Sequence, residues 1–334
     1  MQMAKPKSAS KTFFRVLGYM FRQKWVLAIV LLLVLLNAGA GVAGTYFLKP
    51  ILNDYIVPFI GKETTAADLW PFIRMLMVMA GIYLIGTLSG YICNRLMIRV
   101  SNQTLNSVRG DLFNSLQDLP ISFFDAHTHG ELMSRFTNDA DNVQLALEQS
   151  VVSMCSSCLM FVGLVAMMLF INWKLFLVTA LVLALTMVLF NKLGGRSRRF
   201  YQKQQAALGD VNGDIQEIIE GLKVVKAFTH EEQAKDQFRK LNETYRDAAQ
   251  KANFYSTMIM PVSGNLMNIS YALTAAFGGL LSVIQGFDLG GLVVYLNYSK
   301  QVGQPLNQIS QQMTTLLSAL AGAERIFEVM DTQP

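Results

Sequence analysis

Residues 26–48 read VLAIVLLLVLLNAGAGVAGTYFL, a run without a single charged side chain. A helix of about 20 apolar residues is long enough to cross the roughly 30 Å hydrocarbon core of a bilayer. Only 15% of the 334 residues are charged, whereas a typical soluble domain has about 25%. The run is therefore predicted to be a membrane-spanning helix rather than part of a soluble core.

Five further stretches share this lack of charge. They are residues 75–94, 149–173, 175–191, 252–287 and 289–323, the last interrupted only by Lys300. Helices and closed barrels are the structures that satisfy every backbone polar group in lipid. The pattern predicts an all-α membrane protein with six transmembrane helices. The first apolar run is too long for a cleavable signal peptide, so none is expected.

Lysine and arginine are unevenly shared between alternate connections. With the N-terminus in the cytoplasm, the inner segments hold 23 of the 28 basic residues. The outer loops hold only Lys49, Lys62, Arg74 and Lys174. Because cytoplasmic loops carry an excess of Lys and Arg, we predict a multi-pass protein of the cell membrane with both termini in the cytoplasm. The net charge of +5 then requires no nucleic-acid partner.

The two inner connections, 95–148 and 192–251, are each longer than 50 residues. Structureless loops of that length are uncommon, and apolar residues here recur three and four positions apart, as in amphipathic helices. The repeats are Leu105, Val108, Leu112, Leu116 and Leu119; Leu208, Val211, Ile215, Ile218 and Leu222; and, more loosely, Leu132, Phe136, Val143 and Leu147. We expect the spans to continue into the cytoplasm as helical arms of about 25 residues, or roughly 35 to 40 Å.

Each inner connection must reverse direction near its midpoint. Pro120 and Gly130 bracket the first predicted reversal, and the second falls at about 227–232. Both tips carry aromatic residues far from lipid, namely Phe123, Phe124 and Phe228. Exposed apolar side chains at such a position favour docking of a soluble partner. The alternative is packing within the tip itself.

Residues 12–21, ahead of the first span, mix aromatic and apolar residues with flanking basic ones. This composition predicts a short helix in the headgroup layer, with a disordered tail as the alternative. The predicted organisation is a tail and interfacial helix over 1–24, a six-helix domain over 25–330, and the start of a linker over 331–334.

Three segments carry a family resemblance. Residues 119–143, LPISFFDAHTHGELMSRFTNDADNV, resemble the first intracellular loop of ATP-binding-cassette exporters, whose pattern is LP-x-S-FFD-x4-G-[ED]-L-x-SR-x-TND-x-[DE]-x-[VI]. Residues 217–238, EIIEGLKVVKAFTHEEQAKDQF, resemble the second loop, and 321–331, AGAERIFEVMD, resemble the junction to a nucleotide-binding domain. The resemblance implies the transmembrane domain of a type I exporter (type IV fold).

In that family, short coupling helices at the two tips dock onto nucleotide-binding domains. Carried over by position, they fall at about 122–128 and 228–235. The implied contact residues are Ser122, Phe123, Phe124, Asp125, His127, Thr128, Phe228, Thr229, His230 and Glu231. Six spans are half of the family's usual twelve, so a second half is implied, with homodimer and heterodimer both open.

The sequence contains no G-x4-G-K-[ST] phosphate loop and no LSGGQ-like signature. We therefore expect no cofactor and no ATP hydrolysis in this chain alone, with Mg-ATP bound by a nucleotide-binding domain that the sequence lacks. A truncated exporter is expected in preference to a subunit served by a separate ATPase.

Other motifs favour packing over chemistry. The G-x-G-x-x-G of residues 39–44 lies in a span with no βαβ context, so small residues such as Ala40 and Gly44 are expected to let a neighbouring helix approach. The Cys155-x-x-Cys158 pair lacks a second ligand pair, and His127 with His129 make a weak metal site. No metal site is predicted.

Lys300 lies twelve residues after Asp288, about 18 Å along the last span and near mid-membrane. A charge at that depth is costly unless it faces water or a partner. We expect Lys300 to face a substrate cavity and attract anionic head groups, the alternative being a lysine that snorkels or keeps the vestibule wet. Other polar residues expected to face this cavity are Asn37, Tyr46, Asn268, Tyr271, Asn297 and Tyr298.

Three functions fit a protein of this kind. The favoured one is ATP-driven export of a hydrophobic or amphipathic drug, lipid or peptide by alternating access. An ion-coupled transporter usually needs Asp or Glu within its spans, and here Glu148 and Asp288 only flank them. A membrane scaffold or sensor whose arms bind a non-ATPase partner is the remaining alternative.

Overall fold

The computed structural model describes residues 9–60 and 66–333. This part of the chain is helical apart from short turns and contains no strand. Its elements are α1 (Ala9–Phe21), α2 (Lys24–Tyr46), α3 (Leu48–Pro50), η1 (Ile51–Ile56), η2 (Val57–Phe59), α4 (Ala66–Gln117), α5 (Ile121–Ala126), α6 (His129–Ser134), η3 (Arg135–Asp139), α7 (Ala140–Leu145), η4 (Ala146–Ser150), α8 (Val151–Ile171), α9 (Trp173–Glu220), α10 (Leu222–Ala227), α11 (Glu231–Gln285), α12 (Leu289–Gln301) and α13 (Gly303–Met330). Lys62 and residues 1–8 of the predicted tail lie outside the described residues.

Five helices of the described chain are long and apolar enough to cross a membrane. They are Lys24–Phe59, Leu69–Gln117, His129–Ile171, Trp173–Glu220 and Glu231–Gln285. The expectation of an all-α membrane protein is thereby confirmed. The sixth predicted span is divided into α12 and α13 at Val302. Pro305 has no N–H to donate to the carbonyl of Gln301, which explains an interruption at this point.

The longest helices far exceed the thickness of a bilayer. α4 has 52 residues, α9 has 48 and α11 has 55. At 1.5 Å per residue each is roughly 70 to 80 Å long, more than twice the hydrocarbon core. These lengths agree with spans that continue as helical arms.

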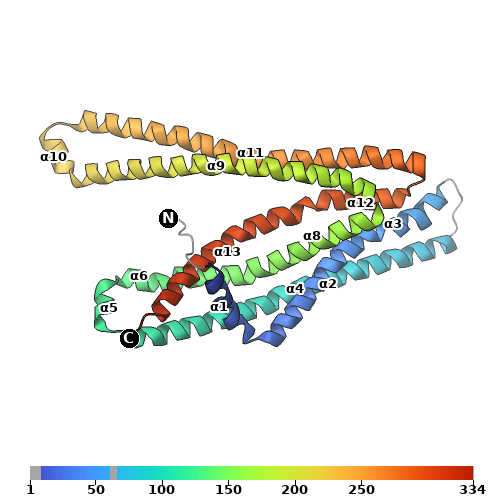
Figure 1. Cartoon of the computed structure of the whole chain (residues 1–334), viewed down its shortest axis with the longest axis horizontal. Helices are drawn as coiled ribbons and strands as arrows, with labels where there is room; N and C mark the ends of the chain where they lie inside the picture. The colour runs from blue at the N-terminus through green and yellow to red at the C-terminus, as the bar shows by residue number, and fades with distance from the viewer. Residues whose placement is uncertain (1–8, 61–65, 334) are drawn as a thin grey trace. The chain divides into compact units, whose positions relative to one another are not determined.

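Contacts divide the chain into two compact units, residues 1–173 with 278–334, and residues 174–277. In the second unit, α9 and α11 run antiparallel and are joined at one end by α10 (Figure 1). Phe200 stacks on Tyr255 with ring centroids 5.1 Å apart, and Gln237 Nε2 donates to Asp214 Oδ1 at 2.5 Å. These contacts join the two helices of the hairpin.

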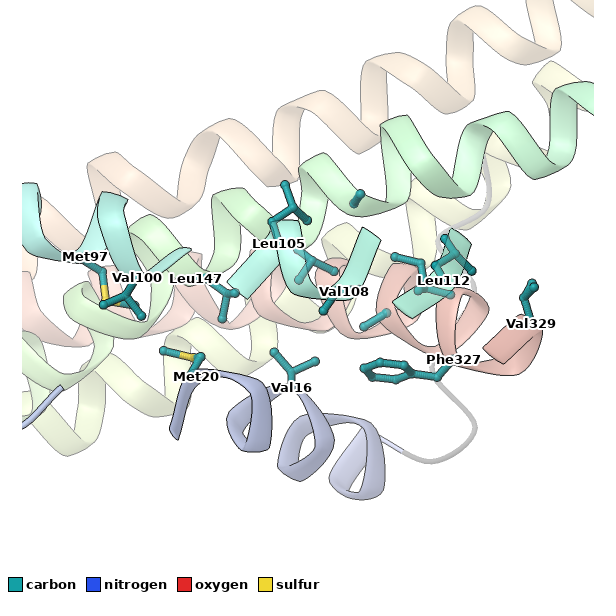
Figure 2. Packing of buried hydrophobic residues seen from close by; sticks show 14 of the residues in the cluster. Val16, Met20, Met97, Val100, Leu105, Val108, Leu112, Leu147, Phe327 and Val329 are labelled. Atoms are coloured by element: carbon teal, nitrogen blue, oxygen red, sulfur yellow. The ribbon is translucent and has the colours of Figure 1, made fainter. Parts of the chain in front are cut away.

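The core of the first unit is built around the inner half of α4. The predicted repeat from Leu105 to Leu119 is buried, together with Val143 and Leu147 of the returning helix. Figure 2 shows Val16 and Met20 of α1 and Phe327 of α13 in the same cluster. A packed apolar core therefore holds the first arm, α1 and the end of α13 together.

The second predicted repeat is only partly right. Val211 is buried and Leu208 and Ile218 are half-buried, but Ile215 and Leu222 are exposed. Two helices in a hairpin bury a narrower stripe than helices in a bundle do. The hairpin therefore buries only part of the five-residue stripe that the sequence predicted.

Small residues bring α2 and α4 close together, as predicted for positions 40 and 44. A Cβ placed on Gly86 of α4 would lie 2.7 Å from the Cβ of Ala40. One placed on Gly44 would lie 2.6 Å from the ring of Tyr83. Neither glycine leaves room for a larger side chain, so α2 and α4 can lie this close only with glycine at both positions.

Candidate functional site

The first tip is a short helix between two turns. α4 ends at Gln117, Pro120 has an extended backbone, and α5 follows. The ring of His127 stacks on that of Phe123 at 4.2 Å, and its Nδ1 lies 2.9 Å from the Phe123 carbonyl oxygen. Thr128 caps α6 by accepting a hydrogen bond from the Glu131 N–H at 3.2 Å. The tip is therefore held by local contacts.

The predicted contact residues of this tip separate into two groups. Phe123 is half-buried and packs against the core of the first unit. Ser122, Phe124, Asp125 and Thr128 are exposed. Beside them Ile121, which sequence reasoning missed, is 80% exposed. Packing within the tip accounts for Phe123, whereas the other side chains are accessible.

At the second tip the short helix lies earlier than predicted. It is α10, over Leu222–Ala227, and residues 228–230 form the turn into α11. The expectation of a helix over 228–235 was wrong in position, because Thr229 has a φ of 54° that no helix accommodates. Glu231 and Glu232 instead occupy the first turn of α11, where acidic side chains favour the helix dipole.

Apolar side chains project from the second tip. Phe228 is 71% exposed and Val224 is 61% exposed, and His230 is also exposed. Lys226 Nζ lies 3.0 Å from Glu231 Oε1. The hydrogen bond from Lys226, together with the backbone N–H of the residue itself, lowers the pKa of Glu231. The tip thus presents an apolar patch with an ion pair beside it.

A cavity of about 220 Å³ lies among α2, α4, α8 and α13. Asn37 is the predicted cavity residue that lines it. Its Nδ2 donates to the Gly86 carbonyl at 2.8 Å. Sequence reasoning missed the other polar lining residues, which come from three helices far apart in the chain: Asn94, Ser153, Ser156 and Gln308.

The remaining predicted cavity residues are not among those that line this cavity. Tyr298 is fully buried, and its hydroxyl donates to the Val42 carbonyl at 2.7 Å. Asn297 is half-buried and donates to the Val293 carbonyl at 2.9 Å, and Tyr46 is half-buried. Asn268 and Tyr271 are exposed on α11, in the second unit.

Lys300 is exposed at the end of α12. Gln304, Asn307 and Gln311 are exposed as well. Val302 keeps a right-handed helical backbone (φ −62°, ψ −24°) across the break, so the spacing of four, three and four places all four side chains near one helical face. We name Lys300, Gln304, Asn307 and Gln311 the polar row. Its spacing can be read from the sequence, although only Lys300 was predicted to face a cavity.

The end of α13 is tied to the first arm by an ion pair. Arg325 donates to both carboxylate oxygens of Asp139 in η3, whose side chain is only 6% exposed. A Cβ on Gly322 would lie 3.2 Å from the Asp139 carbonyl oxygen, so the two segments are in close contact. Movement of the arm must therefore be transmitted to α13, or break this pair.

Helix α1 holds the same end of α13 from another side. Arg15 pairs with Asp331 at 2.7 Å and lies 4.2 Å above the ring of Phe327. Tyr19 stacks on Phe327 and donates to Asp111 Oδ2 at 2.8 Å. Burial, and then the bond to Asp111, raise the pKa of Tyr19 to about 12. The phenol therefore remains a donor throughout the physiological pH range.

In residues 9–60 and 66–333, no group of three or more His, Cys, Asp or Glu side chains is placed to hold a metal ion. Cys93 is buried, and Cys155 and Cys158 are exposed free thiols.

Comparison of the sequence with known proteins assigns the chain to a family. Residues 13–306 match the family described as "ABC transporter transmembrane region". The chain is 37% identical, over 98% of its length, to an uncharacterized ABC transporter ATP-binding protein (YfiC) of Bacillus subtilis strain 168, of which it covers 53%.

Two other relatives have names that state a cargo. A fatty acid ABC transporter ATP-binding/permease protein of Mycobacterium bovis is 31% identical over 83% of this chain and 43% of the relative. An ATP-dependent lipid A-core flippase of Aromatoleum aromaticum is 29% identical over 99% of this chain and 55% of the relative. The chain thus spans about half the length of the curated relatives it matches.

Proposed function

Because this chain belongs to the family of ABC exporter transmembrane domains, we propose that it is the permease half of an ATP-driven exporter. It moves a hydrophobic or amphipathic substrate out of the cytoplasm or the inner leaflet by alternating access. A second transmembrane half and two nucleotide-binding domains complete the transporter, and Mg-ATP is bound by those domains.

The exposed apolar side chains at the two tips carry this proposal. Each tip lies at the end of helices longer than the bilayer is thick, and each presents large apolar groups: Ile121 and Phe124 at one, Val224 and Phe228 at the other. Such patches are typical of protein interaction sites. The tips act as coupling helices, with Ser122–Thr128 and Phe228–Glu231 contributing contacts to the nucleotide-binding domains.

Contacts at both ends of α2 support a sixth crossing. Near its C-terminal end, Asn53 Nδ2 donates to Asp288 Oδ2 at 2.6 Å, immediately before α12. Beyond its N-terminal end, Arg15 of α1 pairs with Asp331 immediately after α13. The segment from Asp288 to Asp331 therefore runs the full length of α2. With both termini in the cytoplasm, α12 and α13 together form the sixth span of a domain over residues 25–330.

Lipid-like substrates are favoured by two observations. Two of the reported relatives are named for fatty acid and lipid A-core, and the polar row offers one cation among neutral amides. A positive charge at mid-membrane is stable only if it faces water or an anionic partner. We propose that the polar row faces the transport pathway and that Lys300 attracts anionic head groups.

Coupling at the tips is testable with the chain joined to its ATP-hydrolysing domains in proteoliposomes. Phe228→Ser removes the most exposed aromatic ring of the second tip. ATP-dependent movement of a fluorescent fatty acid is expected to fall at least tenfold, because a buried aromatic contact at an interface contributes about 2 kcal/mol or more. Basal ATP hydrolysis is expected to persist.

Phe254→Ser is the matched control, since Phe254 is an exposed phenylalanine on α11, about six helical turns beyond the second tip. Transport by this variant is expected to equal that of the unmodified protein. Equal transport by the Phe228 and Phe254 variants would contradict docking at the tip. ATP-independent binding of a soluble partner through Phe228, without transport, would favour the scaffold alternative.

A further inference from the structure

The cavity among α2, α4, α8 and α13 is lined by uncharged residues. Its polar lining consists of Asn37, Asn94, Ser153, Ser156 and Gln308, and within the described part of the chain no charged residue lines it. All of the lining residues belong to the first compact unit. The cavity therefore does not depend on the placement of α9 and α11.

Two of these side chains are held by hydrogen bonds that use only one of their two polar atoms. The other atom of each can bind a ligand. Asn37 uses its Nδ2 on the Gly86 carbonyl at 2.8 Å, which leaves its Oδ1 as an acceptor. Gln308 accepts from Ser157 Oγ through its Oε1 at 2.8 Å, which leaves its amide nitrogen as a donor. The cavity thus offers an acceptor, donors and two serine hydroxyls.

By residue position, the lining of the cavity extends from one end of the predicted spans toward their middle. Asn94 directly precedes Arg95, whereas Asn37 lies eleven residues into the first uncharged run, about 16 Å along the helix. At that depth polar groups without partners are costly, so they must be satisfied by water or by a ligand. An ionised ligand would find no countercharge in the lining.

We propose that this cavity binds the uncharged, hydroxyl- or amide-bearing head group of a membrane amphiphile. At about 220 Å³ it has room for a polar group the size of several water molecules. Val34 and Val152 supply apolar wall for the first part of an acyl chain. The site goes beyond the proposed export pathway, because Lys300 is not among its lining residues and the ligand chemistry is neutral.

Photolabelling of the full chain in phosphatidylcholine nanodiscs tests this site. The probe is a monoacylglycerol that carries a diazirine near the head group, and the comparison is the fatty acid of the same chain length. Saturable labelling of α4 and α8 peptides by the monoacylglycerol is expected, competed by the unlabelled compound. Labelling by the fatty acid at pH 9, where its carboxyl group is ionised even in a bilayer, is expected to be about tenfold weaker.

Variants distinguish a built site from a gap between helices. The double variant Ser153→Ala, Ser156→Ala is expected to reduce labelling about fivefold or more through loss of two hydrogen bonds. Ser310→Ala is the control, because that exposed hydroxyl bonds to the Leu306 carbonyl of its own helix. Its labelling is expected to be unchanged.

A glycine pair adds a test that leaves every polar lining residue present. A Cβ on Gly90 would lie 2.7 Å from Asn37 Nδ2 and displace that amide, whereas a Cβ on Gly81 of the same helix meets nothing within 4 Å. Gly90→Ala is expected to abolish saturable labelling, and Gly81→Ala to preserve it.

Three results would overturn the proposal: unsaturable labelling of α4 and α8, equal labelling by the ionised fatty acid, or equal labelling of the serine double variant and the Ser310→Ala control. The assay requires neither ATP nor transport. Loss of transport in a tip variant with labelling intact would therefore bear on the export proposal alone.

Discussion

Lys300 combines a full positive charge with a position about 18 Å into the last apolar segment. The three nearest members of its helical face, Gln304, Asn307 and Gln311, are neutral amides. An anion that enters the pathway would therefore meet one attractive charge among neutral hydrogen-bonding groups. This arrangement favours selectivity for charge over selectivity for shape.

Lys300→Ala is expected to reduce transport of an anionic amphiphile about tenfold, which corresponds to about 1.4 kcal/mol. Transport of a neutral amphiphile of the same length is expected to change less than about twofold, and Lys300→Arg is expected to restore the anionic substrate. Uptake into inside-out vesicles measures both. An equal loss for the two substrates would remove the electrostatic role.

Asp288 gives a pH-dependent contact at the start of α12. Its carboxylate accepts from Asn53 Nδ2 at 2.6 Å and from the Gly291 N–H at 2.8 Å, and Lys49 Nζ lies 3.4 Å away. Burial alone would raise the pKa of Asp288, but these bonds and the Lys49 charge hold it below its usual range. The ionised form is therefore the one that the fold stabilises.

A depressed pKa contributes stability above the unfolded value of about 4, and the contribution is lost as the pH falls through the lower folded value. Hydrogen exchange at residues 289–292 is expected to show weaker protection at pH 3 than at pH 7. The effect is expected to be below about 1 kcal/mol, since the pair is partly exposed. Asp288→Asn should flatten this dependence; an unchanged pH profile in that variant would assign it to another group.

At the scale of elements, the contact between α2 and α4 depends on the absence of side chains. Gly86→Ala would place a Cβ 2.7 Å from that of Ala40, so the helices must separate. The expected cost is about 1 to 3 kcal/mol, seen as a lower melting temperature in detergent. Gly81→Ala adds the same helix propensity without a clash. If the two variants have the same melting temperature, the packing of α2 on α4 does not depend on this contact.

The sequence predicts an element well where the residue pattern of that segment itself determines the structure. The buried stripe of α4 was predicted correctly because the three-and-four spacing of Leu105, Val108 and Leu112 marks one helical face. The position of α10 was missed because the chain turns at Thr229, a β-branched residue that seldom adopts a positive φ. No residue type in that segment signals such a turn.

The cavity was missed for a different reason. Asn37 was expected to line a site, but Ser153 and Gln308 come from segments more than 100 residues away and meet it only through helix packing. Asn268 and Tyr271 were chosen for the same polarity and are exposed on α11. Polarity within a span predicts that a partner exists; it does not predict which one.

At the scale of the whole chain, the number of membrane crossings determines on which side of the membrane the C-terminal end of α13 lies. Length and composition alone give five candidate spans, because α12 has only 13 residues and α13, although 28 residues long, is less apolar than the other five helices. Asp288 contacts Asn53 beyond one end of α2, however, and Asp331 contacts Arg15 before the other. A segment that runs the length of a spanning helix must itself cross, so we expect an even number of crossings.

Single cysteines in a background without Cys93, Cys155 and Cys158 test this expectation in intact cells. A membrane-impermeant maleimide is expected to label Ile60→Cys from outside, and to label Lys223→Cys and Thr332→Cys only after permeabilisation; all three positions are exposed. Six crossings place residues 223 and 332 on the same side, whereas five place them on opposite sides. Labelling of position 332 from outside, with position 223 protected, would mean that α12 and α13 do not span, and the contact between Arg15 and Asp331 could then not form beside α1.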